Sequence, residues 1–178
     1  MPLRRGRCGP LNVLETERLA LREASEGDAP FILALLNSPG FIENIGDRSV
    51  RTEAEAAAYV RERVLASYRD HGFGMWVVVE LATGDLIGLA GLVKRDGLEP
   101  PDVGYALLAG AWGQGYAQEA AAAVVRHARE RLGLGKLAAI TSPENHASMA
   151  VLRKVGFTFQ GLIRLPDAEA DSTYFTLD

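Results

Sequence analysis

The first patterned region of the chain predicts a strand followed by a helix. Residues 18–24, RLALREA, alternate apolar and polar side chains with the period of two that is typical of a strand. Ser25 and Asp28 are suitable helix caps, and the apolar spacing of residues 29–37 predicts a helix that stops at Pro39. The amino-terminal half therefore begins as strand and then helix.

A second helix is predicted after an irregular segment at 41–51. Thr52 and Glu55 have the spacing of a capping box, and the helix should end near Gly72. Its apolar stripe recurs at Ala57, Val60, Val64 and Tyr68.

The middle of the chain predicts an antiparallel meander. Apolar segments at 74–81 and 86–93 are separated by a short hairpin turn, and a loop at 95–101 leads into a third strand at 102–108. The pattern then changes to a glycine loop followed by alternating helices and strands. The predicted elements are a helix at 116–132, a strand at 136–141, a helix at 146–155, a strand at 157–163 and a last strand at 173–177.

A strand, helix and strand in succession place two strands parallel in an otherwise antiparallel sheet. We therefore predict a mixed α/β (α+β) fold, with a mostly antiparallel sheet flanked by helices. The glycine loop follows the carboxyl end of a strand, where such sheets tend to bind ligands.

Composition and charge narrow the class of protein. The chain has 178 residues, of which 48% are hydrophobic and 24% charged, so one globular domain is expected. We predict a basic arm at 1–14 and a single domain at 15–178. Without the three arginines of the arm, 16 basic residues face 23 acidic ones, which argues against nucleic-acid binding and mildly favours a cationic partner.

Several other classes are disfavoured by the sequence. No apolar run reaches the roughly 18 residues of a membrane span or follows the basic arm as a signal peptide would require, so no membrane partner is expected. The single cysteine, Cys8, cannot form an internal disulfide, which fits a reducing, cytoplasmic compartment. The three histidines show no metal-ligand spacing, and no metal site is predicted.

The segment 109–125, AGAWGQGYAQEAAAAVV, carries the clearest chemistry. Gly113 and Gly115 let the backbone approach a ligand, and the following helix offers free N–H groups and a positive dipole end to a phosphate group. A Walker A loop is excluded because no Gly-Lys-Ser/Thr is present. A dinucleotide fingerprint is excluded because its third glycine is replaced by Gln118. A simple tight turn remains the alternative.

The segment 112–120, WGQGYAQEA, followed by 145–157, NHASMAVLRKVGF, resembles the GNAT acetyltransferases and in particular their RimJ/RimL-like branch. The resemblance spans nearly the whole chain. It implies a central, splayed parallel strand pair and acetyl-CoA as co-substrate. The residues it implies for coenzyme A binding are Leu107, Trp112, Gly113, Gln114, Gly115, Tyr116, Ala117 and Asn145. Trp112 replaces the usual Gln or Arg of the pattern, and Leu107 would use its backbone N–H at the thioester carbonyl while its side chain packs in the core.

Direct attack by an amine is favoured over a covalent enzyme intermediate, because Cys8 is far along the chain and no Gly-x-Ser-x-Gly elbow occurs. The amine must lose a proton to a carboxylate or an ordered water. Asp102 is the first candidate base, Glu99 and Asp96 are reserves, and Glu43 and Asp47 should border the acceptor pocket. The alternative interpretation of each of these carboxylates is a solvated surface charge.

A proton donor is needed for the leaving thiolate. The resemblance places a tyrosine at position 152, but this chain has Leu152, and Ser148 lies one helical turn earlier on the same face. Ser148 is therefore the predicted donor, with helix capping as the alternative, and Asn145 is the predicted cap. Tyr105 and Tyr116 are expected to be packing residues, although either can line the slot.

These features predict a cytoplasmic N-acetyltransferase that transfers an acetyl group to a primary amine in a ternary complex. The acceptor is a small molecule or a protein N-terminus, and the enzyme is a monomer or homodimer. A non-catalytic acyl-CoA-binding or sensory module is the main alternative, supported by Leu152. An RNA-docking role for the basic arm is a weaker one.

Overall fold

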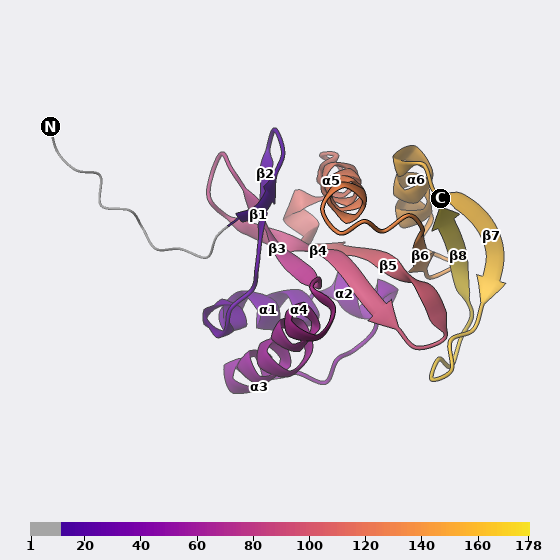
Figure 1. The fold of residues 1–178 in the computed structure, drawn as a ribbon. Helices are drawn as coiled ribbons and strands as arrows, with labels where there is room; N and C mark the ends of the chain where they lie inside the picture. Colours follow the sequence, from indigo (N-terminus) through magenta and orange to yellow (C-terminus); the bar gives the residue numbers. More distant parts are fainter. Residues whose placement is uncertain (1–11) are drawn as a thin grey trace, which may run out of the picture.

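The computed structural model describes residues 12–178, which contain an eight-stranded sheet in the order β1-β2-β3-β4-β5-β6-β8-β7 (Figure 1). The strands are β1 (Asn12–Glu15), β2 (Leu19–Arg22), β3 (Met75–Glu80), β4 (Leu86–Arg95), β5 (Leu98–Leu107), β6 (Leu137–Thr141), β7 (Thr158–Ile163) and β8 (Ser172–Leu177). The helices are α1 (Ala29–Leu36), α2 (Pro39–Asn44), α3 (Glu53–Tyr59), α4 (Ala66–His71), α5 (Tyr116–Glu130) and α6 (His146–Val155).

The pairing of the strands confirms the predicted mixed sheet. Strands β5 and β6 are parallel, and the other neighbouring strands in the described chain are antiparallel. The parallel pair arises because α5 carries the chain back across the sheet between β5 and β6, as a crossover connection must.

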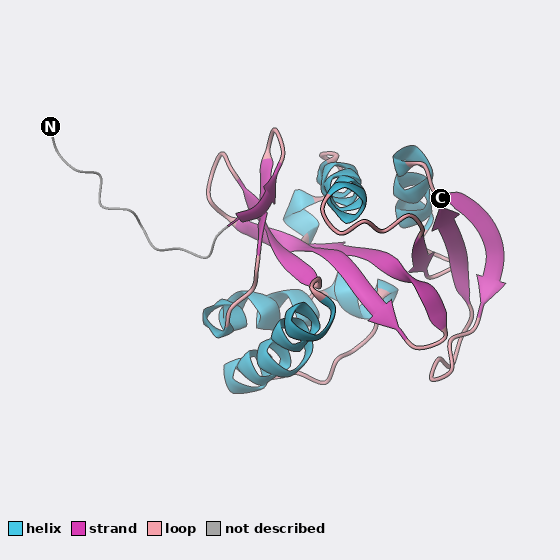
Figure 2. Ribbon diagram, viewed as in Figure 1, coloured by secondary structure: helices cyan, strands magenta, loops and turns pink. Residues whose placement is uncertain are grey.

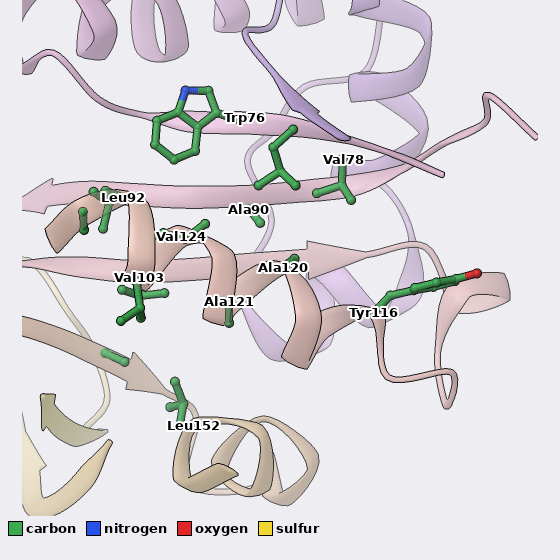
Figure 3. Close-up of a cluster of buried hydrophobic side chains, with 14 of the residues drawn as sticks. Trp76, Val78, Ala90, Leu92, Val103, Tyr116, Ala120, Ala121, Val124 and Leu152 are labelled. Atoms are coloured by element: carbon green, nitrogen blue, oxygen red, sulfur yellow. The ribbon is translucent and has the colours of Figure 1, made fainter. Parts of the chain in front are cut away.

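Helices cover both faces of the sheet (Figure 2). Helices α5 and α6 pack on one face, and α1 to α4 pack on the other. Strand β3 shows why both faces are apolar: Trp76 and Val78 point to the α5 side, whereas Val77 between them points to the opposite side. The buried apolar side chains on the α5 side form one cluster, shown in Figure 3. In it, the small side chains of Ala120 and Ala121 let α5 lie close to the strands.

The second predicted helix is confirmed together with its caps. The Glu55 N–H donates to Thr52 Oγ1 at 3.2 Å, and the Thr52 N–H donates to Glu55 Oε2 at 3.0 Å. Gly72 ends the helix in the left-handed region, with φ 74°. The continuous helix includes a π-helical segment, Val60–Leu65, between α3 and α4.

The prediction that 41–51 is irregular is wrong for its first residues. Pro39 starts a short helix, α2, that includes Phe41 and runs to Asn44. Proline is favoured in the first turn of a helix because its missing N–H would have no partner there. Helix α1 already ends at Leu36, and the proline predicted to stop it begins the next helix.

Two predicted boundaries also shift. Strand β1 begins at Asn12, inside the range 1–14 predicted as an arm, and residues 1–11 of that arm lie outside the described residues. Strand β5 begins at Leu98, so the loop predicted at 95–101 shrinks to a tight turn with Gly97 at φ 79°. Two prolines fit at the start of β5 because its pairing with β6 begins only at Asp102.

Candidate functional site

The glycine loop lies where β5 ends and α5 begins. Gly113 and Gly115 have φ values of 72° and 81°, which glycine adopts without strain. A Cβ built on Gly113 would meet no described atom within 4 Å, so the space beside this backbone is open. The first N–H groups of α5 have no partner within the helix and carry its positive dipole end, which suits them to bind an anion.

Trp112 connects this loop to two other segments. Its indole N–H donates to the Leu107 carbonyl at 2.9 Å, and its ring packs so closely on Gly40 of α2 that a Cβ there would lie 2.5 Å from the indole. The side chain nevertheless remains 53% exposed. The sequence pattern indicated only the loss of a polar contact at this position, and it gave no signal for the packing against α2.

A network of ion pairs and hydrogen bonds holds the other side of the loop. Glu119 accepts hydrogen bonds from Thr16 Oγ1 at 2.6 Å and from the Arg18 backbone N–H at 2.9 Å, and it pairs with the Arg18 guanidinium at 2.7 Å. Burial raises the pKa of Glu119, but these donors outweigh burial and hold its pKa below the usual value. Arg18 also donates to the Gln114 carbonyl at 2.8 Å and stacks over the Tyr116 ring at 4.4 Å. These hydrogen bonds and the ion pair hold the connection between β1 and β2 against the glycine loop.

Strands β5 and β6 diverge beside this loop. The described residues show one paired position between them, Asp102 with Ala138, although β5 continues to Leu107. The Leu108 N–H donates to Ile87 of β4 at 2.9 Å. Since backbone groups alternate along a strand, the Leu107 N–H and C=O face the opposite edge, toward the gap between the strands. The Leu107 side chain is buried in the core, as the sequence analysis expected.

A tyrosine and a serine meet across this region. The Tyr105 hydroxyl of β5 lies 2.8 Å from Ser148 Oγ and donates to the Ser148 carbonyl at 3.1 Å. Burial raises the pKa of Tyr105 to about 12, so the phenol stays protonated near neutrality. No motif in the sequence predicted this contact. Alternation along β5 was a usable signal, because it places Tyr105 on the same face as Val103 and Leu107.

The start of α6 confirms the predicted cap. Asn145 Oδ1 accepts the Ser148 N–H at 3.1 Å, which leaves the side-chain NH2 group of Asn145 available to donate to another partner. Leu152, which stands where the resemblance implied a tyrosine, is 1% exposed and belongs to the buried cluster (Figure 3). A tyrosine at this position would have to displace core side chains.

Asp102 lies in a very different environment from the one expected of a base. It is 1% exposed; Oδ2 accepts from Arg95 Nε at 2.6 Å, and Oδ1 accepts from the Ile140 N–H at 3.2 Å. Burial raises the pKa of this carboxyl above its ordinary value, and the charge of Arg95 opposes the rise. Both carboxylate oxygens already have partners within the protein.

The other candidate carboxylates lie at the surface. Asp96 and Glu99 are exposed in the β4–β5 hairpin, and Glu43 is exposed on α2. Asp47 pairs with Arg51 at 2.5 Å, and this partner lowers the pKa of Asp47 to about 2. All four candidate carboxylates are therefore exposed to solvent, and a border of the acceptor pocket at Glu43 and Asp47 stays a prediction.

Metal-binding clusters and membrane-spanning helices are both absent from the described residues. Within residues 12–178, no three His, Cys, Asp or Glu side chains come together in a way that could bind a metal ion. No helix in the same range combines the length and apolar character that crossing a bilayer requires. Cys8 and the arginines of the predicted arm lie outside the described residues.

Comparisons with known proteins agree on one family. The family model described as "Acetyltransferase (GNAT) domain" matches residues 18–158. The FsC-acetyl coenzyme A-N(2)-transacetylase of Aspergillus fumigatus is 31% identical over 153 residues, covering 82% of this chain and 64% of that protein.

Two solved structures show the same arrangement of elements. The acetyltransferase from Agrobacterium tumefaciens str. C58 superposes with a TM-score of 0.79 and 28% identity, over 98% of this chain and 99% of that one. The ribosomal L7/L12 alpha-N-protein acetyltransferase RimL, in complex with coenzyme A, gives a TM-score of 0.78 at 20% identity, over 94% and 97% of the two chains.

Proposed function

Because the chain belongs to the GNAT acetyltransferase family and is an N-acetyltransferase, we propose that it transfers the acetyl group of acetyl-CoA directly to a primary amine while both substrates are bound. The alternative of a non-catalytic binding module has no support among these relatives, whose names describe acetyl transfer.

The open glycine loop beside an unpaired strand edge carries this proposal. The backbone N–H groups of the loop and the first turn of α5 would bind the pyrophosphate of coenzyme A, because an anion is stabilised at a helix N-terminus. The residues concerned are Gly113, Gln114, Gly115, Tyr116 and Ala117. Trp112 would flank them, and the Asn145 side-chain amide would contact the pantetheine arm in the gap between β5 and β6.

Two groups are proposed to act on the thioester. The Leu107 N–H faces the gap and would donate to the carbonyl oxygen, on which negative charge develops as the amine attacks. The Ser148 hydroxyl would donate a hydrogen bond to the leaving thiolate, whose reference pKa is about 8.5. Tyr105, at 2.8 Å from Ser148 Oγ, would hold that hydroxyl in position beside the sulfur.

The acceptor is proposed to be a primary amine of a small molecule or of a protein N-terminus. RimL is named as an alpha-N-protein acetyltransferase of ribosomal L7/L12, and the Aspergillus relative is named as an FsC-acetyl coenzyme A-N(2)-transacetylase. The acidic body of the chain favours an acceptor that carries positive charge. A cytoplasmic location and a monomeric or homodimeric state remain our expectations.

The test is an acetyl-transfer assay on the full chain. Acetyl-CoA is mixed with a panel of small primary amines and with peptides bearing free N-termini, and release of free thiol is measured together with the mass of the product. We expect thiol release that depends on an amine, and a rise in Tm when coenzyme A is added. Ser148→Ala should lower kcat by about 10-fold or more while coenzyme A still raises Tm.

The proposal would be overturned by a chain whose Tm does not change with coenzyme A and which acetylates no amine. A covalently acetylated enzyme isolated without acceptor would instead overturn direct transfer in a ternary complex.

A further inference from the structure

Asp102 forms an unusual junction between three strands. Its own backbone belongs to β5, its Oδ2 accepts from Arg95 of β4, and its Oδ1 accepts from the backbone N–H of Ile140 in β6. The residue is 1% exposed, and the aspartate and Arg95 side chains form an ion pair at 2.6 Å. A buried carboxylate needs such partners because loss of its hydration is otherwise costly.

The hydrogen bond to Ile140 replaces a bond of the sheet. Strands β5 and β6 are paired where Asp102 lies opposite Ala138. In a parallel ladder, every second residue of a strand donates to the same neighbour. Ile140 follows Ala138 by two residues, so its N–H is the next one directed at β5, where a continued ladder would offer it a backbone carbonyl. The carboxylate of Asp102 accepts that N–H instead.

A side chain that occupies the next ladder position keeps the two backbones apart. Strand β5 runs five residues beyond Asp102, to Leu107, and β6 runs on to Thr141, yet the described residues show no further pair between them. The gap that begins at this carboxylate is the one that the Leu107 backbone faces and that Tyr105 and Ser148 border. Asp102 thus stands at the inner end of the proposed pantetheine slot.

The same contacts leave Asp102 poorly suited to be a base. Each of its oxygens has a protein donor, and its burial leaves no surface from which an amine can approach. We propose that Asp102 is a positioning residue. With Arg95 it acts as a wedge that prevents further backbone pairing between β6 and β5, and it so keeps open the slot for the pantetheine arm. This inference rests on the proposed binding of coenzyme A.

The experiment compares three variants of the full chain by calorimetric binding of coenzyme A and by steady-state kinetics. Asp102→Val removes the wedge, and we expect coenzyme A affinity to fall by 10-fold or more. Asp102→Asn keeps an acceptor for the Ile140 N–H, and it should restore most of that affinity. Arg95→Gln leaves the carboxylate without its cation, and we expect an intermediate loss. KM for acetyl-CoA should rise in the valine variant, whereas in the asparagine variant both KM and kcat should stay within a few-fold of the wild type.

A second readout does not depend on activity. The Ile140 amide should exchange with solvent hydrogen more slowly in the wild type than in Arg95→Gln, which keeps the Asp102 acceptor but removes its cation. This comparison remains informative if Asp102→Val fails to fold.

The possible outcomes separate the two proposals. If the wild type binds no coenzyme A, the proposed function fails. If the wild type binds it and Asp102→Val binds equally well, only the wedge is wrong. If Asp102→Asn instead lowers kcat by 100-fold or more and leaves KM unchanged, the wedge is overturned and Asp102 is restored as the base.

Discussion

Single residues of the glycine loop show how backbone conformation prepares a binding site. Gly115 is the N-cap of α5 and has φ 81°, a region that costs an L-residue about 1–2 kcal/mol. From the sequence, this glycine is expected to let the backbone approach a ligand. The structure adds a second reason, since the turn into α5 itself requires a positive φ.

We predict that Gly115→Ala destabilises the protein and weakens coenzyme A binding. The strain should lower Tm by roughly 2–8 °C, because each kcal/mol corresponds to about 2–4 °C in a domain of this size. The added methyl group would lie 3.4 Å from the Arg18 guanidinium, so conformation rather than crowding is the cause. Thermal unfolding with and without coenzyme A measures both effects.

Gly110→Ala is the matched control for this prediction. Gly110 lies in the same connection, has no positive φ, and would place its Cβ in open space. Its Tm and coenzyme A affinity should stay close to those of the wild type. Equal losses in the two variants would show that the left-handed turn at Gly115 is not the important feature.

At the scale of elements, a buried ion pair joins strand β2 to the helix α1 that follows it. Arg22 of β2 makes two hydrogen bonds with Asp28, at 2.9 and 2.7 Å, and the Asp28 side chain is buried just before α1. Burial raises the pKa of Asp28, but the Arg22 guanidinium and the Ser25 N–H outweigh it and hold this pKa below the usual value. The direction from β2 into α1 is therefore fixed by a charge pair.

We predict that this pair makes the stability of the protein depend on pH. A carboxyl whose pKa is lowered by folding stabilises the native state above its unfolded pKa of about 3.9, and this contribution is lost as the pH falls through the folded pKa. Asp28→Asn should therefore cost about 1.5–3 kcal/mol at pH 7. The difference from the wild type should shrink below about pH 4. Denaturant unfolding at several pH values measures it.

Glu26→Gln provides the control for the pH experiment. Glu26 is a neighbouring carboxylate whose pair with Arg61 is exposed, and exposed pairs contribute little to stability. Its free energy of unfolding should match that of the wild type at every pH. A constant deficit of Asp28→Asn across the whole pH range would contradict the assigned role of the Asp28 charge.

At the scale of the whole molecule, the sheet consists of two parts that meet at one paired position. The antiparallel strands β1 to β5 form the larger part, and β6, β8 and β7 form the smaller one. Between them lie the pair at Asp102 and Ala138, the Asp102 wedge, and the packing of α5 against α6. A ligand bound between the parts would add contacts to both.

We predict that coenzyme A slows hydrogen exchange most strongly in β6 and β8. Binding at 100 times Kd stabilises the native state by about 2.7 kcal/mol, which corresponds to roughly 100-fold slower exchange for amides that open with the ligand site. Amides of β3, in the centre of the larger part, serve as the internal reference and should slow less. Uniform protection of the whole sheet, or none in β6 and β8, would contradict this two-part description.

The sequence alone determined the features that depend on interactions between residues close together along the chain. Alternation and helical spacing predicted most strands and helices, the capping box at Thr52 and Glu55, the cap at Asn145, and the glycine loop that starts α5. These signals are short-ranged, because propensity, capping and turn geometry involve residues a few positions apart. Pro39 is the exception, since a proline is compatible with both the end of one helix and the start of another.

Only the tertiary structure decided what several of the selected residues do. It brought Tyr105 to Ser148 from 43 positions away, fastened Glu119 to Arg18 from 101 positions away, and buried Asp102 between Arg95 and Ile140. The local sequence pattern does not distinguish a strand carboxylate that faces solvent from one that faces another strand. Its partners come from distant segments that only folding brings together, and those partners set its burial, its pKa and its role.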